Sequence, residues 1–380
     1  MPDDIALYIH IPFCLRKCNY CSFVSYPQRE ADIPAYVNAL KKELDLLAGG
    51  KHLHSIYFGG GTPSLLSASQ LGDILSSVSC LCKVDKTAEI TIEANPGTVS
   101  EPYFRTARTL GINRLSLGVQ SLNDAELAVM GRIHTAAEAR EAVFFARNAG
   151  FINLNLDLIY GLPGQTLADW RRALSEALAI QAEHLSLYCL TLEAGVPMWE
   201  AIQRGELPDA DPDLSADQYE MAEDLLAEHG YSHYEISNWA KPGYECRHNL
   251  TYWHNSPYLG IGAAAHSCLD GQRRANTADI NKYLAAFSGK AAPVLDLNED
   301  ISLELQLAET AILGLRLCQG IDAGDIRGRF GVDLLQRYRH EVTEMVSAGL
   351  LECEDRCLRL TRRGRLLSNE VFWRFLPDSR

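Results

Sequence analysis

Strict alternation of apolar and polar residues in several short segments restricts the fold more than any other feature of the sequence. Between positions 153 and 159, leucine at every second residue alternates with asparagine or aspartate. Positions 89–95 and 114–120 alternate in the same way. A parallel strand covered by helices on both faces is apolar throughout, so these strands have one apolar face and one small, polar face. The pattern predicts a barrel with helices outside and a lumen that holds a polar ligand.

Helical segments separate the expected strands. Apolar residues at helical spacing predict a helix from Ile33 to Leu47. Alternation of strands and helices implies parallel βαβ units and an α/β fold. Residues 195–215 are rich in Gly, Pro and Asp and are expected to form a connector before helix resumes at 214–226. The strands expected are Leu7–Ile11, Ser55–Phe58, Glu89–Ala94, Arg114–Val119, Asn153–Ile159, Glu183–Leu190 and one near Tyr234–Ser237.

A separate region begins near Ile301. It starts with leucines at helical spacing and ends in two short strands, 350–353 and 357–360, around a charged turn. Helices followed by a small hairpin are typical of a winged helix. Such a domain can contact phosphates through basic side chains, here Arg356, Arg359, Arg362, Arg363 and Arg365. The net charge of −14 argues against this interpretation, and winged helices also serve as lids or docking faces; we expect no specific nucleic-acid partner.

The cysteine motif Cys14-x3-Cys18-x2-Cys21 follows the first expected strand and lies in a loop, where three thiolates can converge. A [4Fe–4S] cluster with three protein ligands keeps one iron open for a small chelating molecule. Two alternatives are three unrelated buried cysteines and three of four zinc ligands, for which His10 is the nearest fourth. Two further cysteine pairs, 80/82 and 353/357, lack a second pair at ligand spacing and are interpreted as incidental thiols.

Together with the segment Tyr8-Ile-His-Ile-Pro-Phe-Cys14, this motif resembles the radical S-adenosylmethionine (SAM) superfamily. Within it, the sequence is similar to the oxygen-independent coproporphyrinogen III oxidase-like branch, and most of all to the HemW-type heme chaperones in that branch. The resemblance extends over essentially the whole chain. It implies a [4Fe–4S] cluster on the three motif cysteines, with SAM as a second cofactor. We expect a partial (β/α)6 TIM-like radical SAM barrel over residues 1–238, a connector over 239–300, and a smaller winged-helix-like α+β domain over 301–380.

The resemblance also implies the residues that contact SAM. Gly59-Gly60-Gly61-Thr62-Pro63 follows the second strand, and glycine lets backbone amides approach a ligand closely. It is not a Walker loop, because no Gly-Lys-Ser/Thr follows. In the family this segment holds the amino group of the methionine part of SAM. Each polar residue taken alone could be an ordinary structural group; the set implied for SAM is Tyr8, Gly60, Gly61, Thr62, Glu93, Gln120, Arg132 and Asp157.

The element His248-Asn-Leu-Thr-Tyr-Trp253 is similar to the His-Asn-x-x-Tyr-Trp element of the heme chaperones. Imidazole is a common axial ligand of heme iron, so the resemblance makes His248 a candidate heme ligand. His254 and His266 are alternatives that the sequence does not rank against it. A histidine buried in an aromatic core is the other interpretation of this element.

Two differences bear on the activity. In the decarboxylating enzymes the cluster motif continues as Cys-x-Cys, whereas Ser22 and Phe23 follow Cys21 here. Those enzymes also carry an N-terminal extension before the cluster motif. In this sequence the cluster motif begins at residue 14. We therefore expect a protein that binds heme and delivers it to a hemoprotein acceptor, with an electron donor for the cluster. The alternative is the enzyme, in which reductive SAM cleavage drives decarboxylation of coproporphyrinogen III to protoporphyrinogen IX; SAM cleavage itself is compatible with both.

The chain is expected to be cytoplasmic. No apolar run reaches the roughly 18–20 residues of a membrane span, and the acidic start Met1-Pro2-Asp3-Asp4 is unlike a signal peptide. The 11 cysteines form an odd set, which fits free thiols in a reducing compartment better than a disulfide framework. Peripheral contact with a membrane is compatible with this composition.

Overall fold

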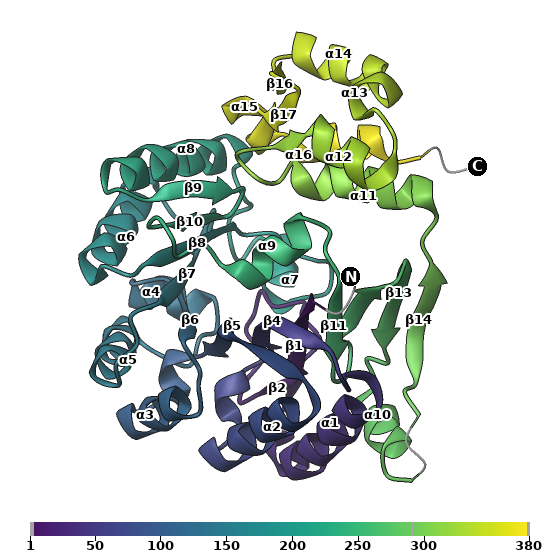
Figure 1. The fold of residues 1–380 in the computed structure, drawn as a ribbon. Helices are drawn as coiled ribbons and strands as arrows, with labels where there is room; N and C mark the ends of the chain where they lie inside the picture. Colours follow the sequence, from purple (N-terminus) through teal and green to yellow (C-terminus); the bar gives the residue numbers. More distant parts are fainter. Residues whose placement is uncertain (1–3, 290–291, 378–380) are drawn as a thin grey trace.

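A curved sheet of parallel strands organises the larger part of the chain (Figure 1). The computed structural model describes residues 4–289 and 292–377. The strands expected from the alternation pair in parallel in chain order, and together they form the barrel wall. These strands are β1 (Asp4–Ile11), β4 (His52–Gly60), β5 (Lys83–Ala94), β6 (Arg114–Gln120), β7 (Leu154–Tyr160) and β8 (His184–Cys189). The predicted α/β barrel is confirmed.

Helices cover the outer face of this sheet, so that the apolar face of each strand packs against them (Figure 1). Three of these helices begin with a capping box, in which a Ser or Thr side chain and a Gln, Glu or Asp three residues later satisfy each other's backbone amides. The outer helices are α1 (Ile33–Leu47), α2 (Ala68–Leu81), α3 (Glu101–Thr109), α5 (Ala136–Asn148), α6 (Leu167–Ile180) and α8 (Pro212–Glu228).

Short elements fill the loops between these strands and helices. The segment 195–215, expected to be a connector, contains the helix α7 (Pro197–Gln203), so that prediction is wrong for these residues. Pro197 sits in the first turn, where proline favours a helix. The other short elements are β2 (Phe13–Cys14), β3 (Tyr26–Pro27), η1 (Glu30–Asp32), η2 (Pro63–Leu65), η3 (Pro96–Thr98), α4 (Asp124–Val129), α9 (Arg247–Trp253) and α10 (Ile280–Ala286).

Residues 239–300, treated in the sequence as a connector, add strands to the main sheet. The strand β11 (Tyr258–Ile261) pairs in parallel with β1, while β10 (Asn238–Ala240) pairs with β8 on the opposite side of the barrel. The remaining strands of this twelve-stranded sheet are β9 (Ser232–Glu235), β12 (His266–Leu269), β13 (Gln272–Asn276) and β14 (Leu295–Asp300). The strand expected near Tyr234–Ser237 corresponds to β9. The sequence did not reveal the later strands; that of β13, Gln-Arg-Arg-Ala-Asn, carries no apolar pattern.

The C-terminal region packs around its own apolar core. Its three-stranded sheet has the order β15-β17-β16, and the predicted hairpin at 350–360 is β16 and β17. This arrangement confirms a small winged-helix-like α+β domain. Its elements are α11 (Leu303–Gly314), β15 (Ile321–Asp322), α12 (Ala323–Phe330), α13 (Leu334–Arg337), α14 (Arg339–Ser347), β16 (Leu351–Glu354), β17 (Cys357–Leu360), α15 (Arg362–Leu366), α16 (Ser368–Phe372) and η4 (Trp373–Phe375).

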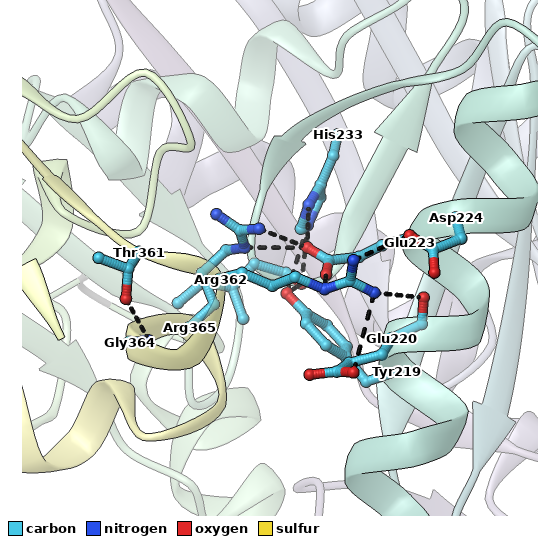
Figure 2. A network of polar contacts seen from close by, with 10 residues as sticks. Tyr219, Glu220, Glu223, Asp224, His233, Thr361, Arg362, Gly364 and Arg365 are labelled. Carbon is cyan, nitrogen blue, oxygen red and sulfur yellow. Dashed lines mark hydrogen bonds and ion pairs between the residues drawn. The ribbon is translucent and has the colours of Figure 1, made fainter. Parts of the chain in front are cut away.

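A buried carboxylate joins this domain to the barrel (Figure 2). Glu223 on α8 is 8% exposed and forms ion pairs with Arg365 at 2.7 Å and Arg362 at 3.0 Å, both from α15. The ring of His233 lies 3.0 Å from the same carboxylate. Arg362 also contacts Asp224 at 2.9 Å. These arginines therefore hold two parts of the fold together.

Ion pairs also involve the basic residues nearer the wing. Arg359 pairs with Glu352 and Glu354, and Arg356 lies 3.6 Å from Asp333. Binding of phosphates would need arginines whose charges are not already paired. Most of these arginines form ion pairs with acidic residues of the chain, which argues against the nucleic-acid interpretation.

None of the helices in residues 4–289 and 292–377 combines the length and the apolar character needed to cross a membrane.

We predict that Glu223→Gln destabilises the chain. Removing the Glu223 charge takes away the carboxylate that faces Arg365, while Arg362 keeps Asp224, and loss of a partner from such a buried pair costs roughly 3 kcal/mol in the free energy of unfolding. Urea denaturation should show this loss, whereas Glu220→Gln, which removes an exposed partner 3.9 Å from Arg362, should cost less than about 1 kcal/mol.

The pH dependence of this network has a definite sign. Burial raises the pKa of Glu223, but the hydrogen bond with His233 and the charge of Arg365 outweigh it and bring the pKa below its ordinary value. The stabilisation is therefore present above about pH 4.5 and is lost as the pH falls through the lowered pKa. An effect of Glu223→Gln that is the same at pH 7 and at pH 3 would contradict this account.

Candidate functional site

A cavity of about 390 Å³ extends from the carboxyl ends of the barrel strands into the lumen. Loops at this end of a parallel barrel are where such folds place their ligands. Tyr8 and His248, two of the predicted site residues, do not line this cavity. The cavity does bring together the other predicted site residues: Cys14, Cys18, Cys21, Gly60, Gly61, Thr62, Glu93, Gln120, Arg132 and Asp157.

Three half-buried thiols from one loop face this cavity. Thr62 donates a hydrogen bond to the sulfur of Cys14 at 3.5 Å, and Arg132 donates to the sulfur of Cys18 at 3.4 Å. Burial raises the pKa of the Cys21 thiol. In the part of the chain that the structure describes, no three Cys, His, Asp or Glu side chains are arranged to share a single metal ion. Thiols that each bind a different iron of a cluster need no such convergence, so three cysteines on one loop are compatible with a cluster.

His10, the candidate fourth zinc ligand, is engaged elsewhere. Its ring nitrogens lie 3.0 Å from the hydroxyl of Tyr8 and 3.2 Å from the carbonyl oxygen of Val24. Glycine is required beside it: Gly60 has φ +117°, and a Cβ there would lie 2.6 Å from the His10 ring. A Cβ at Gly61 would lie 2.6 Å from the Phe13 carbonyl oxygen and 3.0 Å from the Cys14 sulfur. The glycine segment thus allows close approach to the cysteine loop.

Two carboxylates project into the cavity from neighbouring parts of the barrel wall. Glu93 accepts hydrogen bonds from the Tyr57 hydroxyl at 2.8 Å and the Gly60 amide at 3.2 Å. Asp157 accepts from Asn155 at 2.8 Å and from Ser116 at 3.1 Å. Burial and the charge of Asp157 raise the pKa of Glu93 to about 7, and burial also raises the pKa of Asp157. Such a pair favours a ligand that carries positive charge.

Arg132 lies between the cysteine loop and the strand ends. Its guanidinium donates to the Gly118 carbonyl oxygen at 2.7 Å in addition to the Cys18 sulfur. The preceding Gly131 has φ +71° and packs against Asn19, whose own amide donates to the Met130 carbonyl oxygen at 2.9 Å. This turn fixes the arginine above the lumen, where its planar fork can pair with a carboxylate.

Tyr8 lies behind the cavity wall. Its ring stacks near Tyr57 with ring centres 6.2 Å apart, and a Cβ on Gly59 would touch both rings and Glu93. It therefore adjoins the predicted SAM residues without facing the cavity. His248 lies deeper still, on α9, which closes the amino end of the barrel.

The His248 ring is fully engaged inside the protein. It is 1% exposed, with Nδ1 3.0 Å from the Ser55 hydroxyl and Nε2 2.9 Å from the Tyr252 hydroxyl. Its ring stacks on Tyr57 with centres 4.9 Å apart, and burial lowers the pKa of His248 to about 3. Neither ring nitrogen is free for iron in this conformation, so the heme assignment to His248 stays a prediction.

Comparisons with known proteins cover nearly the whole chain. The radical SAM superfamily matches residues 8–177, and the HemN C-terminal domain matches residues 301–367. Heme chaperone HemW of Lactococcus lactis is 38% identical over 375 residues, covering 98% of this chain and 97% of the relative. The HemW proteins of Bacillus subtilis and Escherichia coli are each 36% identical over 98% of this chain. The chain belongs to the HemW family of radical SAM proteins.

A solved structure supports the fold of this HemW-family chain. Coproporphyrinogen III oxidase (HemN) from Escherichia coli, described as a radical SAM enzyme, aligns with a TM-score of 0.86. The alignment covers 98% of this chain and 90% of that protein at 22% identity. The predicted family and architecture are confirmed; at this identity the likeness concerns the fold alone.

Sequence reasoning missed several residues of the HemW-family cavity. The alternation of β6 and β7 already placed Arg114 and Asn155 on the polar face, but neither was selected as a site residue. Asn249 stands beside His248 in sequence and lines the cavity from α9. The further lining residues without a predicted role include Tyr20, Tyr57, Ser116, Ser186 and Tyr188.

A second cavity, of about 370 Å³, separates the end of α9 from the C-terminal domain. His254 is exposed and lines it next to Trp253, while Arg329 of α12 donates to the carbonyl oxygens of His254 and Asn255 at 3.0 and 2.6 Å. Unlike the His248 ring, the His254 ring is accessible. The structure thus distinguishes buried His248 from exposed His254; His266, the third candidate, is exposed at the start of β12.

The raised pKa of Glu93 predicts a pH-dependent effect of Glu93→Gln on the ligand-free protein. The Glu93 carboxyl has a pKa of about 7 in the folded state and about 4.5 in the unfolded state. Its contribution to stability is therefore complete below pH 4.5 and is lost as the pH rises through 7. The free energy of unfolding of the variant should therefore rise relative to the parent between pH 4.5 and pH 8.

Urea denaturation at several pH values measures this difference. Glu141→Gln, which changes an exposed residue of α5, is the control and should show no such trend. A constant difference between Glu93→Gln and the parent across this range would show that Glu93 ionises normally.

Proposed function

We propose that this chain is a heme chaperone that binds a [4Fe–4S] cluster, SAM and heme, and delivers heme to target hemoproteins. The observation that carries the proposal is similarity along nearly the full length to curated heme chaperones, at 36–38% identity over 98% of the chain. The thiols, carboxylates and arginine that line the cavity support the proposal. A cytoplasmic location and an electron donor for the cluster belong to the same proposal.

In this proposal Cys14, Cys18 and Cys21 hold the cluster. A bound cluster would supply one-electron chemistry to SAM. The residues of the chain would position the cofactor. Arg132 is placed to pair with a carboxylate, Glu93 and Asp157 to accept from ammonium or hydroxyl groups, and the amides of Gly60 and Gly61 to approach closely. Thr62 and Gln120 line the same cavity, and Tyr8 packs beside Tyr57, which donates to Glu93.

Heme would bind near the aromatic element on α9. His248 can act as an axial ligand only if its ring leaves the hydrogen bonds with Ser55 and Tyr252. His254 offers an imidazole that needs no such change. A heme site at the edge of the fold also suits delivery to an acceptor, because the ligand leaves without unfolding the barrel.

The competing function is decarboxylation of coproporphyrinogen III, which the fold shared with the Escherichia coli enzyme permits. The sequence after the cluster motif differs from those enzymes at Ser22 and Phe23, and Phe23 is 70% exposed at the cavity rim. We therefore favour heme delivery over decarboxylation as the function of this chain.

The cluster assignment predicts that replacing Cys14, Cys18 and Cys21 together by Ala abolishes cluster assembly. Anaerobic reconstitution of the parent should give about four irons per chain, since a [4Fe–4S] centre contains four. Iron analysis and the visible absorption spectrum measure the result. Replacing Cys80 and Cys82 by Ala should leave the cluster intact, and a full cluster in the triple variant would refute the assignment.

The heme assignment predicts a Soret band when heme is added to the cluster-loaded protein. His248→Ala and His254→Ala distinguish the two imidazoles, because loss of the axial ligand shifts or weakens the band. The cluster should survive both changes, since its ligands lie on another loop. If the parent binds no heme, or binds it with the same spectrum in both variants and in their double variant, the proposed ligands are wrong.

A further inference from the structure

Arg114 is a buried arginine with no role in the proposed function. It is the first residue of β6 and points into the lumen, where it lines the inner part of the cavity that also contains Glu93 and Asp157. The side chain is 1% exposed and is among the largest buried groups of the protein. It lies next to Cys246 and Tyr57, close to α9.

The guanidinium of Arg114 has no hydrogen-bond partner among the residues that the structure describes. Within residues 4–289 and 292–377, nothing accepts a hydrogen bond from the Arg114 guanidinium or forms an ion pair with it within 4.0 Å, and its Nε is buried and unsatisfied. Burial lowers the pKa of Arg114, but Cys246, Glu89 and other groups around it act at longer range and raise it. Arg132, in the same cavity, donates to Gly118 and Cys18. A guanidinium has five N–H donors, and burying them without acceptors is unfavourable. The hydroxyl of Thr91, the register partner of Arg114 on β5, is also buried and unsatisfied.

The carboxylates of the lumen are already held by other donors. Glu89, whose charge raises the pKa of Arg114, accepts from the amides of Arg247 and His248 at the start of α9, each at 3.1 Å. Glu93 is held by Tyr57 and Gly60, and Asp157 by Asn155 and Ser116. Arg114 therefore stands in a cavity wall with its charge uncompensated at hydrogen-bond range.

We propose that Arg114 binds a carboxylate group of a small molecule that enters the lumen below the residues assigned to SAM. The planar fork of arginine matches a carboxylate with two parallel hydrogen bonds. Arg132 is placed for the carboxylate of SAM in the proposed function, so Arg114 serves a second acid. This inference goes beyond heme delivery and does not depend on heme. The carboxylate can belong to a free small acid or to a propionate side chain of a tetrapyrrole.

Propionate is a probe that presents this group alone. Cluster-loaded, SAM-saturated protein without reductant is titrated with propionate, and binding is followed by saturation-transfer NMR. The parent should show saturable binding, Arg114→Gln should weaken it at least tenfold, and Arg114→Lys should have an intermediate effect. Arg108→Gln, which changes an exposed arginine of α3, is the matched control and should bind like the parent. Propionamide, the neutral counterpart, should not bind.

Equal propionate binding by Arg114→Gln and the parent would overturn the proposal, as would equal binding of propionamide. Asn249→Asp provides a second test if Arg114→Gln does not fold, because it adds a negative charge to the lining of the same cavity while retaining Arg114. Unchanged propionate binding by Asn249→Asp would also overturn it. Heme titration of Arg114→Gln separates the two sources: unchanged heme affinity identifies a free acid, and a parallel loss identifies a tetrapyrrole propionate.

Discussion

The polar interior of the barrel is the constraint on which the rest of the structure depends. Carboxylates, an arginine, amides and hydroxyls fill a lumen that most parallel sheets would fill with apolar side chains. Each buried group needs a partner, and the network around Asn155 shows how these are found. Its amide donates to Ser116 and Asp157, while its oxygen lies 2.6 Å from His184 and accepts from Ser186. Residues from three strands thus fix the Asp157 carboxylate at the cavity wall.

Closure of the lumen at its amino end depends on a second contact of this kind. The Glu89 carboxylate accepts the first backbone amides of α9, where the partial positive charge of a helix start favours an anion. This contact holds the helix that contains the aromatic element His248–Trp253 in its packed position on the barrel. It explains why His248 is buried against Tyr57 and Ser55, and why His254, at the other end of the short helix, is exposed.

Much of the fold could be predicted from the sequence because the lumen is polar. The alternation in β5, β6 and β7 identified a barrel, and it placed Glu93 and Asp157 on the face where the structure has them. The strands β11 to β14 were not found, since each is only four to six residues long and the sequence of β13 lacks an apolar period. The cysteine loop and the glycine segment follow strands that the pattern located, so their convergence was predictable. The hydrogen bonds of His248 were not, because Ser55 lies 193 residues away in the sequence.

The cavity does not by itself distinguish a heme chaperone from a porphyrinogen decarboxylase, because both would use the same cluster and SAM residues. The most direct measurement supplies the reconstituted protein with SAM, a reductant and coproporphyrinogen III, and quantifies tetrapyrrole products and carbon dioxide over many turnovers. The account predicts that coproporphyrinogen III is recovered unchanged, with any SAM cleavage slow and unrelated to its presence. Sustained formation of protoporphyrinogen IX, with 5′-deoxyadenosine produced in proportion, would contradict it.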